Sequence, residues 1–213
     1  MRAIALLVIF GLCHELLAGS LDVMVKDGKG ALVSDAVVYA KGNGMNAERT
    51  KKQTVIDQQD KQFIPYMTAV QVGTSILFPN KDNIRHHVYS LSSAKKFELP
   101  LYKGVPSEPV LFDKEGFVTL GCNIHDWMIA YVAVLATPYF QVTGNEGHVL
   151  LKNLPTGQYT VEVWQPSLKN APENLAQHVD VSASGIKQIL FTLDLRPGFH
   201  AKRAPGFSTG GYR

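Results

Sequence analysis

The stretch that decides the fold is Gly121-Cys122-Asn123-Ile124-His125-Asp126-Trp127-Met128, followed at once by Ile129-Ala130-Tyr131-Val132-Ala133-Val134-Leu135. The second part is an apolar run without Gly or Pro, which predicts a buried strand directly after a polar loop. Shorter apolar runs recur along the chain, and Gly, Pro, Asn and Asp separate them at intervals of about ten residues. The sequence therefore predicts an all-β protein.

The loop before this strand offers three metal-binding side chains with the spacing C-x-x-H-x-x-M. Cys122 supplies a thiolate, His125 an imidazole and Met128 a thioether. A type 1, or blue, copper site needs two imidazoles and one thiolate in a plane, with a weak axial ligand such as Met. Structural zinc prefers four strong donors and avoids thioethers. The loop therefore favours copper over zinc and requires a second histidine from elsewhere in the chain.

This loop resembles that of the cupredoxins, and its short spacing is most similar to that of amicyanin. Upstream, Leu77-Phe78-Pro79-Asn80-Lys81-Asp82-Asn83-Ile84-Arg85-His86-His87-Val88 is similar to the family stretch in which an Asn opens a loop and a His six residues later is the first ligand. The resemblance implies that His86, Cys122, His125 and Met128 bind a type 1 copper ion that cycles between Cu(I) and Cu(II). With Phe97-Glu98-Leu99-Pro100-Leu101-Tyr102, residues 54–137 also look like bacterial plastocyanin-like proteins often labelled methylamine utilization proteins.

The first-ligand triplet departs from the family pattern. The chain has Arg85-His86-His87 where cupredoxins usually have Pro-His-Asn. Alternation along a strand points His86 and His87 in opposite directions, so only one of them faces the metal. The register favours His86 and leaves His87 as the alternative. The cation of Arg85 next to the metal is expected to raise the reduction potential, and Asp82 is interpreted as a loop residue that caps nearby backbone.

Other interpretations of the ligands remain open at this stage. A buried Cys often acts as a small hydrophobe, Met128 could pack in the core, and His125 could lie on the surface. Cys122 could also act as a nucleophile with His125 as its base, although the loop shows no evident oxyanion donors. The joint spacing and the upstream histidine favour the metal site.

The first twenty residues have the features of a secretory signal peptide. Arg2 precedes the apolar run from Ala3 to Leu12, and Ala18-Gly19-Ser20 closes the segment, which predicts cleavage near Ser20 and a periplasmic protein. The apolar run is too short to span a bilayer. Cys13 lies inside this segment, so the mature chain keeps a single cysteine, Cys122. The formal charge of +3 is too small to indicate nucleic-acid binding.

The strands flanking the copper-binding region are similar to a different family. Residues 147–195 resemble the second half of a carboxypeptidase regulatory-like, or transthyretin-like, β-sandwich, and residues 21–40 resemble its first half. We therefore expect a cupredoxin Greek-key sandwich at residues 53–137, inserted into or joined to an outer sandwich of residues 21–52 and 138–195. The alternative is that the first two strands extend the cupredoxin sheet. The basic tail, residues 196–213, is expected to be disordered.

Together these features predict a non-enzymatic periplasmic protein that carries single electrons between redox partners. The alternatives are a copper delivery protein and an interaction module in which redox turnover plays no part. We expect a protein redox partner, no nucleic acid and no membrane span, and the sequence leaves the oligomeric state open. Tyr102, Trp127 and Tyr131 are candidates for a docking patch near the edge of His125, and ordinary packing over the loop is the alternative for Trp127.

Overall fold

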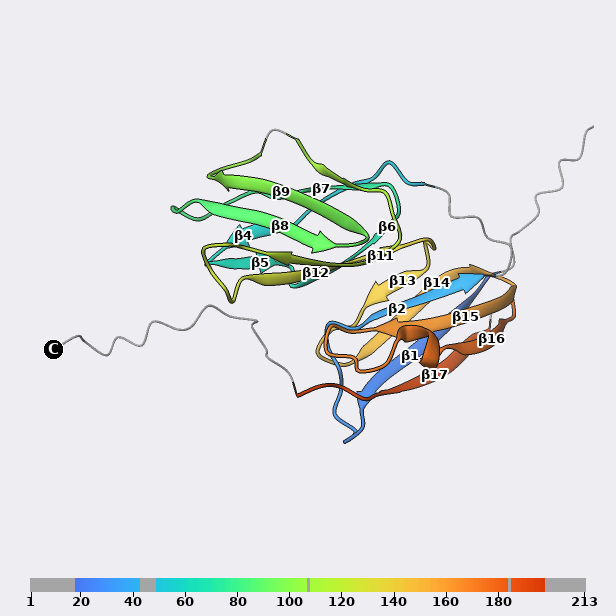
Figure 1. Ribbon diagram of the computed structural model, residues 1–213. Helices are drawn as coiled ribbons and strands as arrows, with labels where there is room; N and C mark the ends of the chain where they lie inside the picture. The colour runs from blue at the N-terminus through green and yellow to red at the C-terminus, as the bar shows by residue number, and fades with distance from the viewer. Residues whose placement is uncertain (1–17, 43–48, 107, 184, 198–213) are drawn as a thin grey trace, which may run out of the picture.

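The computed structural model describes residues 18–42, 49–106, 108–183 and 185–197 (Figure 1). Residues 1–17 of the predicted signal peptide (residues 1–20), residues 43–48 and the part of the predicted tail from residue 198 lie outside this description. The prediction of an all-β fold is confirmed, because the described ranges contain seventeen strands, one short 3-10 helix, η1 (Pro172–Leu175), and no α-helix. Those ranges also hold no helix long and apolar enough to cross a membrane.

The strands form two groups of sheets that occupy different parts of the molecule (Figure 1). The first group has the orders β14-β1-β17 and β13-β2-β15-β16. It consists of β1 (Ala18–Asp27), β2 (Val37–Gly42), β13 (Phe140–Val142), β14 (His148–Pro155), β15 (Gly157–Trp164), β16 (Gln177–Val181) and β17 (Ile186–Leu193). We call this group the outer sandwich.

The second group, which we call the inner sandwich, has the orders β6-β12-β11-β8-β9 and β10-β7-β3, with a small β4-β5 hairpin. It consists of β3 (Gln53–Val55), β4 (Asp57–Gln59), β5 (Gln62–Ile64), β6 (Met67–Gln71), β7 (Thr74–Leu77), β8 (His86–Ser92), β9 (Lys95–Tyr102), β10 (Val110–Phe112), β11 (Gly116–Gly121) and β12 (Ile129–Leu135).

The alternation of side chains explains how the outer sandwich covers its core. Leu21, Val23 and Val25 of β1 are fully buried, while Asp22 and Met24 between them are only partly buried. Successive residues of a strand point to opposite faces, so β1 buries one face and leaves the other toward solvent. This strand lies at the centre of its sheet, antiparallel to β14 and parallel to β17.

The pairing of the first two strands bears on the domain prediction. β1 pairs with β14 and β17, and β2 pairs with β13 and β15. The alternative of an extended cupredoxin sheet requires β1 and β2 to join the sheet that contains β12. In the described residues, neither strand does so. The insertion of residues 53–137 into the outer sandwich stays a prediction, and these pairings support it.

The apolar run of β12 is explained by burial on both faces of the strand. Ala130, Val132 and Val134 point into the core of the inner sandwich. The alternate residues, including Ala133 and Leu135, join a second apolar cluster that contains residues of both sandwiches. A strand buried on both faces has no polar side to alternate with its apolar side, which is why its sequence is continuously hydrophobic.

That second cluster forms the interface between the two sandwiches. Val37 and Tyr39 of β2 pack there with Met67 of β6 and with β12. The ring of Phe117 stacks on Trp164, with centroids 4.2 Å apart and planes inclined by 8°. Lys41 adds a charged link, since its Nζ lies 3.1 Å from Glu162 of the outer sandwich and 3.8 Å from Glu115 of the inner one.

This interface changes the interpretation of Tyr131. Its ring lies edge-on to Tyr66, with centroids 5.4 Å apart, and also contacts Trp164 at 5.9 Å. The side chain is partly buried and packs against both sandwiches, so this packing does not support its predicted place in a docking patch, which stays a prediction. Because β12 is buried on both faces, Tyr131 contacts Trp164 of the outer sandwich, and the sequence of β12 alone does not show this contact.

Candidate metal centre

The loop that leads to His86 is held in place by Asn80. The Asn80 side chain accepts a hydrogen bond from the Asp82 amide at 3.0 Å and donates to the carbonyls of Ile84 and Tyr102 at 2.9 and 2.8 Å. The first of these bonds is the Asx-turn geometry that favours Asn at the start of a loop. The loop ends at His86, the first residue of β8.

The second segment of the site connects two neighbouring strands of one sheet. Cys122 follows the last residue of β11, and Met128 precedes the first residue of β12. Between them the chain turns tightly, and the Met128 amide donates to the His125 carbonyl at 2.9 Å. Because β11 and β12 are paired in antiparallel register, the loop residues are returned to the same end of the sheet.

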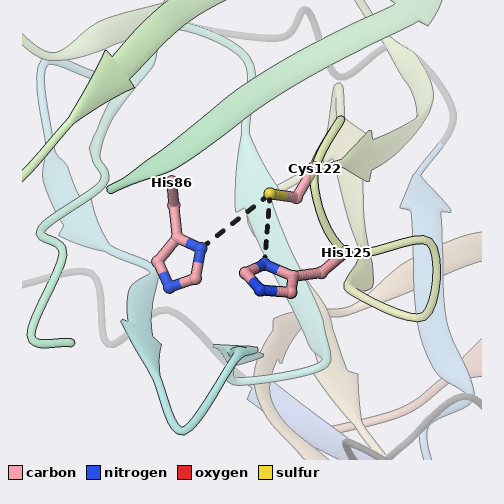
Figure 2. Close-up of side chains that lie close together, drawn as sticks. All are labelled: His86, Cys122 and His125. Carbon is pink, nitrogen blue, oxygen red and sulfur yellow. Dashed lines mark hydrogen bonds between the residues drawn. The ribbon is translucent and has the colours of Figure 1, made fainter. Parts of the chain in front are cut away.

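Three of the predicted ligands meet at this end of the inner sandwich (Figure 2). Cys122 Sγ lies 3.9 Å from His86 Nδ1 and 3.8 Å from His125 Nδ1. One ligand atom from each residue lies within 4.8 Å of the other two. The two rings thus present the same nitrogen, Nδ1, to one sulfur, as Figure 2 shows.

Met128 lies close by in the fold. It is 1% exposed and belongs to the same apolar core cluster as Cys122. Its thioether is soft and weakly polar, so burying it in an apolar core costs little free energy, whether or not the sulfur contacts a metal. Its role as the axial ligand stays a prediction.

Burial differs between the three donors. His86 is fully buried and Cys122 is 4% exposed, whereas His125 is partly exposed. At that exposure the Cys122 thiol is poorly placed to attack a substrate, which weakens its interpretation as a nucleophile. Burial is the largest cause that lowers the pKa of the His125 imidazole, and the charges of His86 and Lys61 act in the same direction.

His87 points away from this group. Its Nε2 lies 2.7 Å from Oε1 of Glu98 on β9, and its ring packs 5.5 Å from Tyr89. His87 contributes no atom to the cluster that His86 forms with Cys122. The geometry therefore favours His86 over His87 as a ligand, in agreement with the register. Arg85 is exposed, and its effect on a reduction potential stays a prediction.

Asp82 has a role that sequence reasoning missed. Its carboxylate lies 2.7 Å from His86 Nε2. It also accepts hydrogen bonds from the backbone amides of Asp60 at 2.7 Å and Lys61 at 2.9 Å. Burial would raise the pKa of Asp82, but hydrogen bonds from the His86 ring and from the two amides outweigh it and lower that pKa. The amides belong to the turn between β4 and β5, so the capped backbone is distant in sequence. The Asp lies four residues before the His, but only the folded loop brings the two together.

The remaining docking candidates have different surroundings. The Tyr102 hydroxyl donates to the Phe78 carbonyl and accepts from the Gln58 amide, so it is directed inward. Trp127 packs beside His125, with ring centroids 5.2 Å apart, and its indole nitrogen is buried. Of the three aromatic candidates, Trp127 is therefore the one that lies against the partly exposed histidine.

The donor chemistry of the cluster fits copper. Two imidazole nitrogens and one thiol converge in a buried site, with a thioether in the adjoining core, and this is the donor set of a blue-copper centre. In addition, His86 bonds through its other nitrogen to a carboxylate, as metal-bound histidines commonly do. Both features are properties of the side chains present and do not depend on a bound ion.

Comparisons with known proteins give structural likenesses only. No protein-family model matches the chain, and no curated protein matches it. Among solved structures, a purple cupredoxin from Nitrosopumilus maritimus is 22% identical with a TM-score of 0.34, over 39% of this chain and 99% of its own. A reduced point mutant of amicyanin is 20% identical with a TM-score of 0.36, over 46% of this chain and 99% of its own.

The copper-containing nitrite reductase from Thermus scotoductus SA-01 is also similar. It is 20% identical with a TM-score of 0.37 over 45% of this chain, but the matched part is only 25% of the reductase. At these values the likenesses carry nothing about the ligand or the activity of this chain. The case for a metal centre rests on the geometry described above.

Proposed function

We propose that the chain is a periplasmic type 1 copper protein that carries single electrons between redox partners. His86, Cys122 and His125 bind the ion in this proposal, and Met128 is its axial ligand. The observation that carries it is the convergence of two imidazole Nδ1 atoms on one buried thiol, at 3.8 and 3.9 Å. When bound, the copper would accept and release one electron, and the four side chains would hold it in place.

The fold supports electron transfer because it holds the donors rigidly. His86 begins the paired strand β8, Cys122 directly follows the paired strand β11, and Asn80 fixes the loop before His86 through three hydrogen bonds. A site whose ligands are fixed by packed strands changes little between two oxidation states. This favours fast exchange of electrons over chemistry on a substrate.

The partly exposed His125 suggests where a partner would contact the protein. Ile124, its neighbour in the sequence, is 48% exposed, and the Trp127 ring packs beside that of His125. A small apolar surface suits the weak, transient contacts of electron-transfer complexes. A copper delivery protein would need its ligands to open for exchange, and the full burial of His86 opposes this.

The domain arrangement completes the proposal. Residues 53–137 form the copper-binding domain, and residues 21–52 with 138–195 form a transthyretin-like sandwich around the insertion point. The two share an apolar interface with a stacked aromatic pair, Phe117 and Trp164. The outer sandwich would then present the copper-binding end of the inner one in a fixed orientation.

The test is the visible absorption and electron paramagnetic resonance of the secreted, copper-loaded protein. The thiolate gives an intense band near ~600 nm and a narrow copper hyperfine splitting in a type 1 site. Cys122→Ser should lose both signals. His148→Ala is the matched control, because His148 bonds to Asp22 on the outer sandwich and should leave both signals intact. A colourless wild-type protein, or one that prefers zinc, would refute the proposal.

A further inference from the structure

A carboxylate hydrogen-bonded to a buried imidazole determines which of the two ring nitrogens donates a hydrogen bond. An ionised carboxylate can only accept hydrogen bonds. Asp82 lies 2.7 Å from His86 Nε2, so this nitrogen is the donor of the hydrogen bond to the ionised carboxylate. In the neutral ring that can bind a metal, the other nitrogen, Nδ1, then has the free lone pair, and it is the atom that lies 3.9 Å from Cys122 Sγ.

The position of this carboxylate is itself tightly determined. Two backbone amides donate to it from the turn between β4 and β5, and the Asp82 amide is held by Asn80. The Asp82 side chain is 14% exposed and that of His86 is not exposed at all. A charged hydrogen bond in such a place is stronger than one in water, because little solvent competes for it.

We propose that Asp82 is a positioning residue that sets the reduction potential of the metal centre through His86. This inference rests on the proposed function. The negative charge makes the imidazole a more electron-rich ligand and stabilises the more positive ion, Cu(II), more than Cu(I). Asp82 therefore lowers the potential. It opposes the increase that we expect from the Arg85 cation on the exposed side of the same loop.

The change that tests this is Asp82→Asn. An amide offers one acceptor oxygen and one donor group where the carboxylate offers two acceptors, so at least one of the three donors that face it loses its partner. Loss of such an outer partner typically reduces metal affinity about 10- to 100-fold. We expect Cu(II) affinity to fall by this amount and Cu(I) affinity to fall less.

The potential follows from the ratio of the two affinities. Each tenfold by which the Cu(II) affinity falls more than the Cu(I) affinity raises the potential by about 59 mV for a one-electron couple. The matched control is Asp57→Asn, because Asp57 pairs with Lys81 at 2.6 Å in the same region but bonds to no predicted ligand. A potential that rises in Asp82→Asn and not in Asp57→Asn supports the inference. Equal potentials in all three proteins, with the copper spectrum intact, overturn it.

A second measurement needs neither copper nor a variant. Long-range nitrogen–proton NMR of the metal-free wild-type protein at neutral pH identifies which His86 nitrogen carries the proton. We expect the proton on Nε2. A proton on Nδ1 would overturn the inference even if the protein binds copper. A proton on Nε2 in a protein that gives no copper–thiolate band would keep the positioning of His86 by Asp82 and refute only the proposed function.

Discussion

Replacing Trp164 by alanine should weaken the interface between the two sandwiches. The indole stacks on Phe117 and lies edge-on to Tyr131, both in the inner sandwich. Two aromatic contacts contribute about 1–3 kcal/mol beyond the area they bury. Loss of roughly 100 Å² of buried apolar surface, at about 25 cal/mol per Å², adds about 2.5 kcal/mol. We therefore expect Trp164→Ala to reduce the free energy of unfolding by about 3.5–5.5 kcal/mol, close to the values for truncating large aromatic residues.

The assay follows each sandwich separately. The chain has two tryptophans, so Trp127 becomes the sole indole fluorophore in the variant and reports on the inner sandwich. Hydrogen exchange of β1 reports on the outer sandwich. The two denaturation midpoints should coincide in the wild-type protein and separate in Trp164→Ala, because the variant loses contacts that couple the sandwiches.

Tyr139→Ala provides the control for this experiment. Tyr139 contacts Tyr159 within the outer sandwich, with ring centroids 6.1 Å apart and planes inclined by 86°. Its loss should destabilise the protein without separating the two midpoints. If Trp164→Ala leaves stability unchanged, or keeps the midpoints as close as in the wild type, the interface does not couple the sandwiches as we describe.

Three further changes test individual parts of the site. Met128→Leu should retain copper and raise its reduction potential in voltammetry, since a weak axial donor is lost; a lower potential would contradict the axial role. His87→Ala should leave the visible spectrum unchanged, because His87 Nε2 bonds to Glu98; loss of the band would make His87 the ligand. Gly121→Ala would place a Cβ 2.9 Å from the Tyr89 ring, so thermal unfolding should show a loss of about 1–3 kcal/mol, and an unchanged midpoint would argue against this packing.

Much of the fold could be predicted from local patterns. The strand from Ile129 to Leu135 was expected from its apolar run, and its observed bounds are the same. Alternation along β8 is also why His86 and not His87 lies beside Cys122, because adjacent residues of a strand face opposite ways; that His86 binds a metal stays a prediction. The physical cause of both features lies within a few residues of the chain.

The sequence was less informative where the cause is a contact between distant segments. Tyr131 was a candidate for a docking patch, but its ring also contacts Trp164 of the outer sandwich, and a continuous apolar run does not show how many faces are buried. Asp82 looked like a local cap, but it joins a hairpin more than twenty residues away to the His86 ring. No short-range pattern contains either contact.

The central claim is that His86, Cys122 and His125 bind one copper ion together. Its most direct test is the copper-edge X-ray absorption spectrum of the loaded protein, recorded for the wild type and for Cys122→Ser. The account predicts scattering from one short sulfur and two imidazole nitrogens, with the short sulfur contribution lost in the variant and only the long, weak one from Met128 left. A wild-type spectrum with only nitrogen and oxygen neighbours, or a short sulfur contribution that persists in Cys122→Ser, would contradict it.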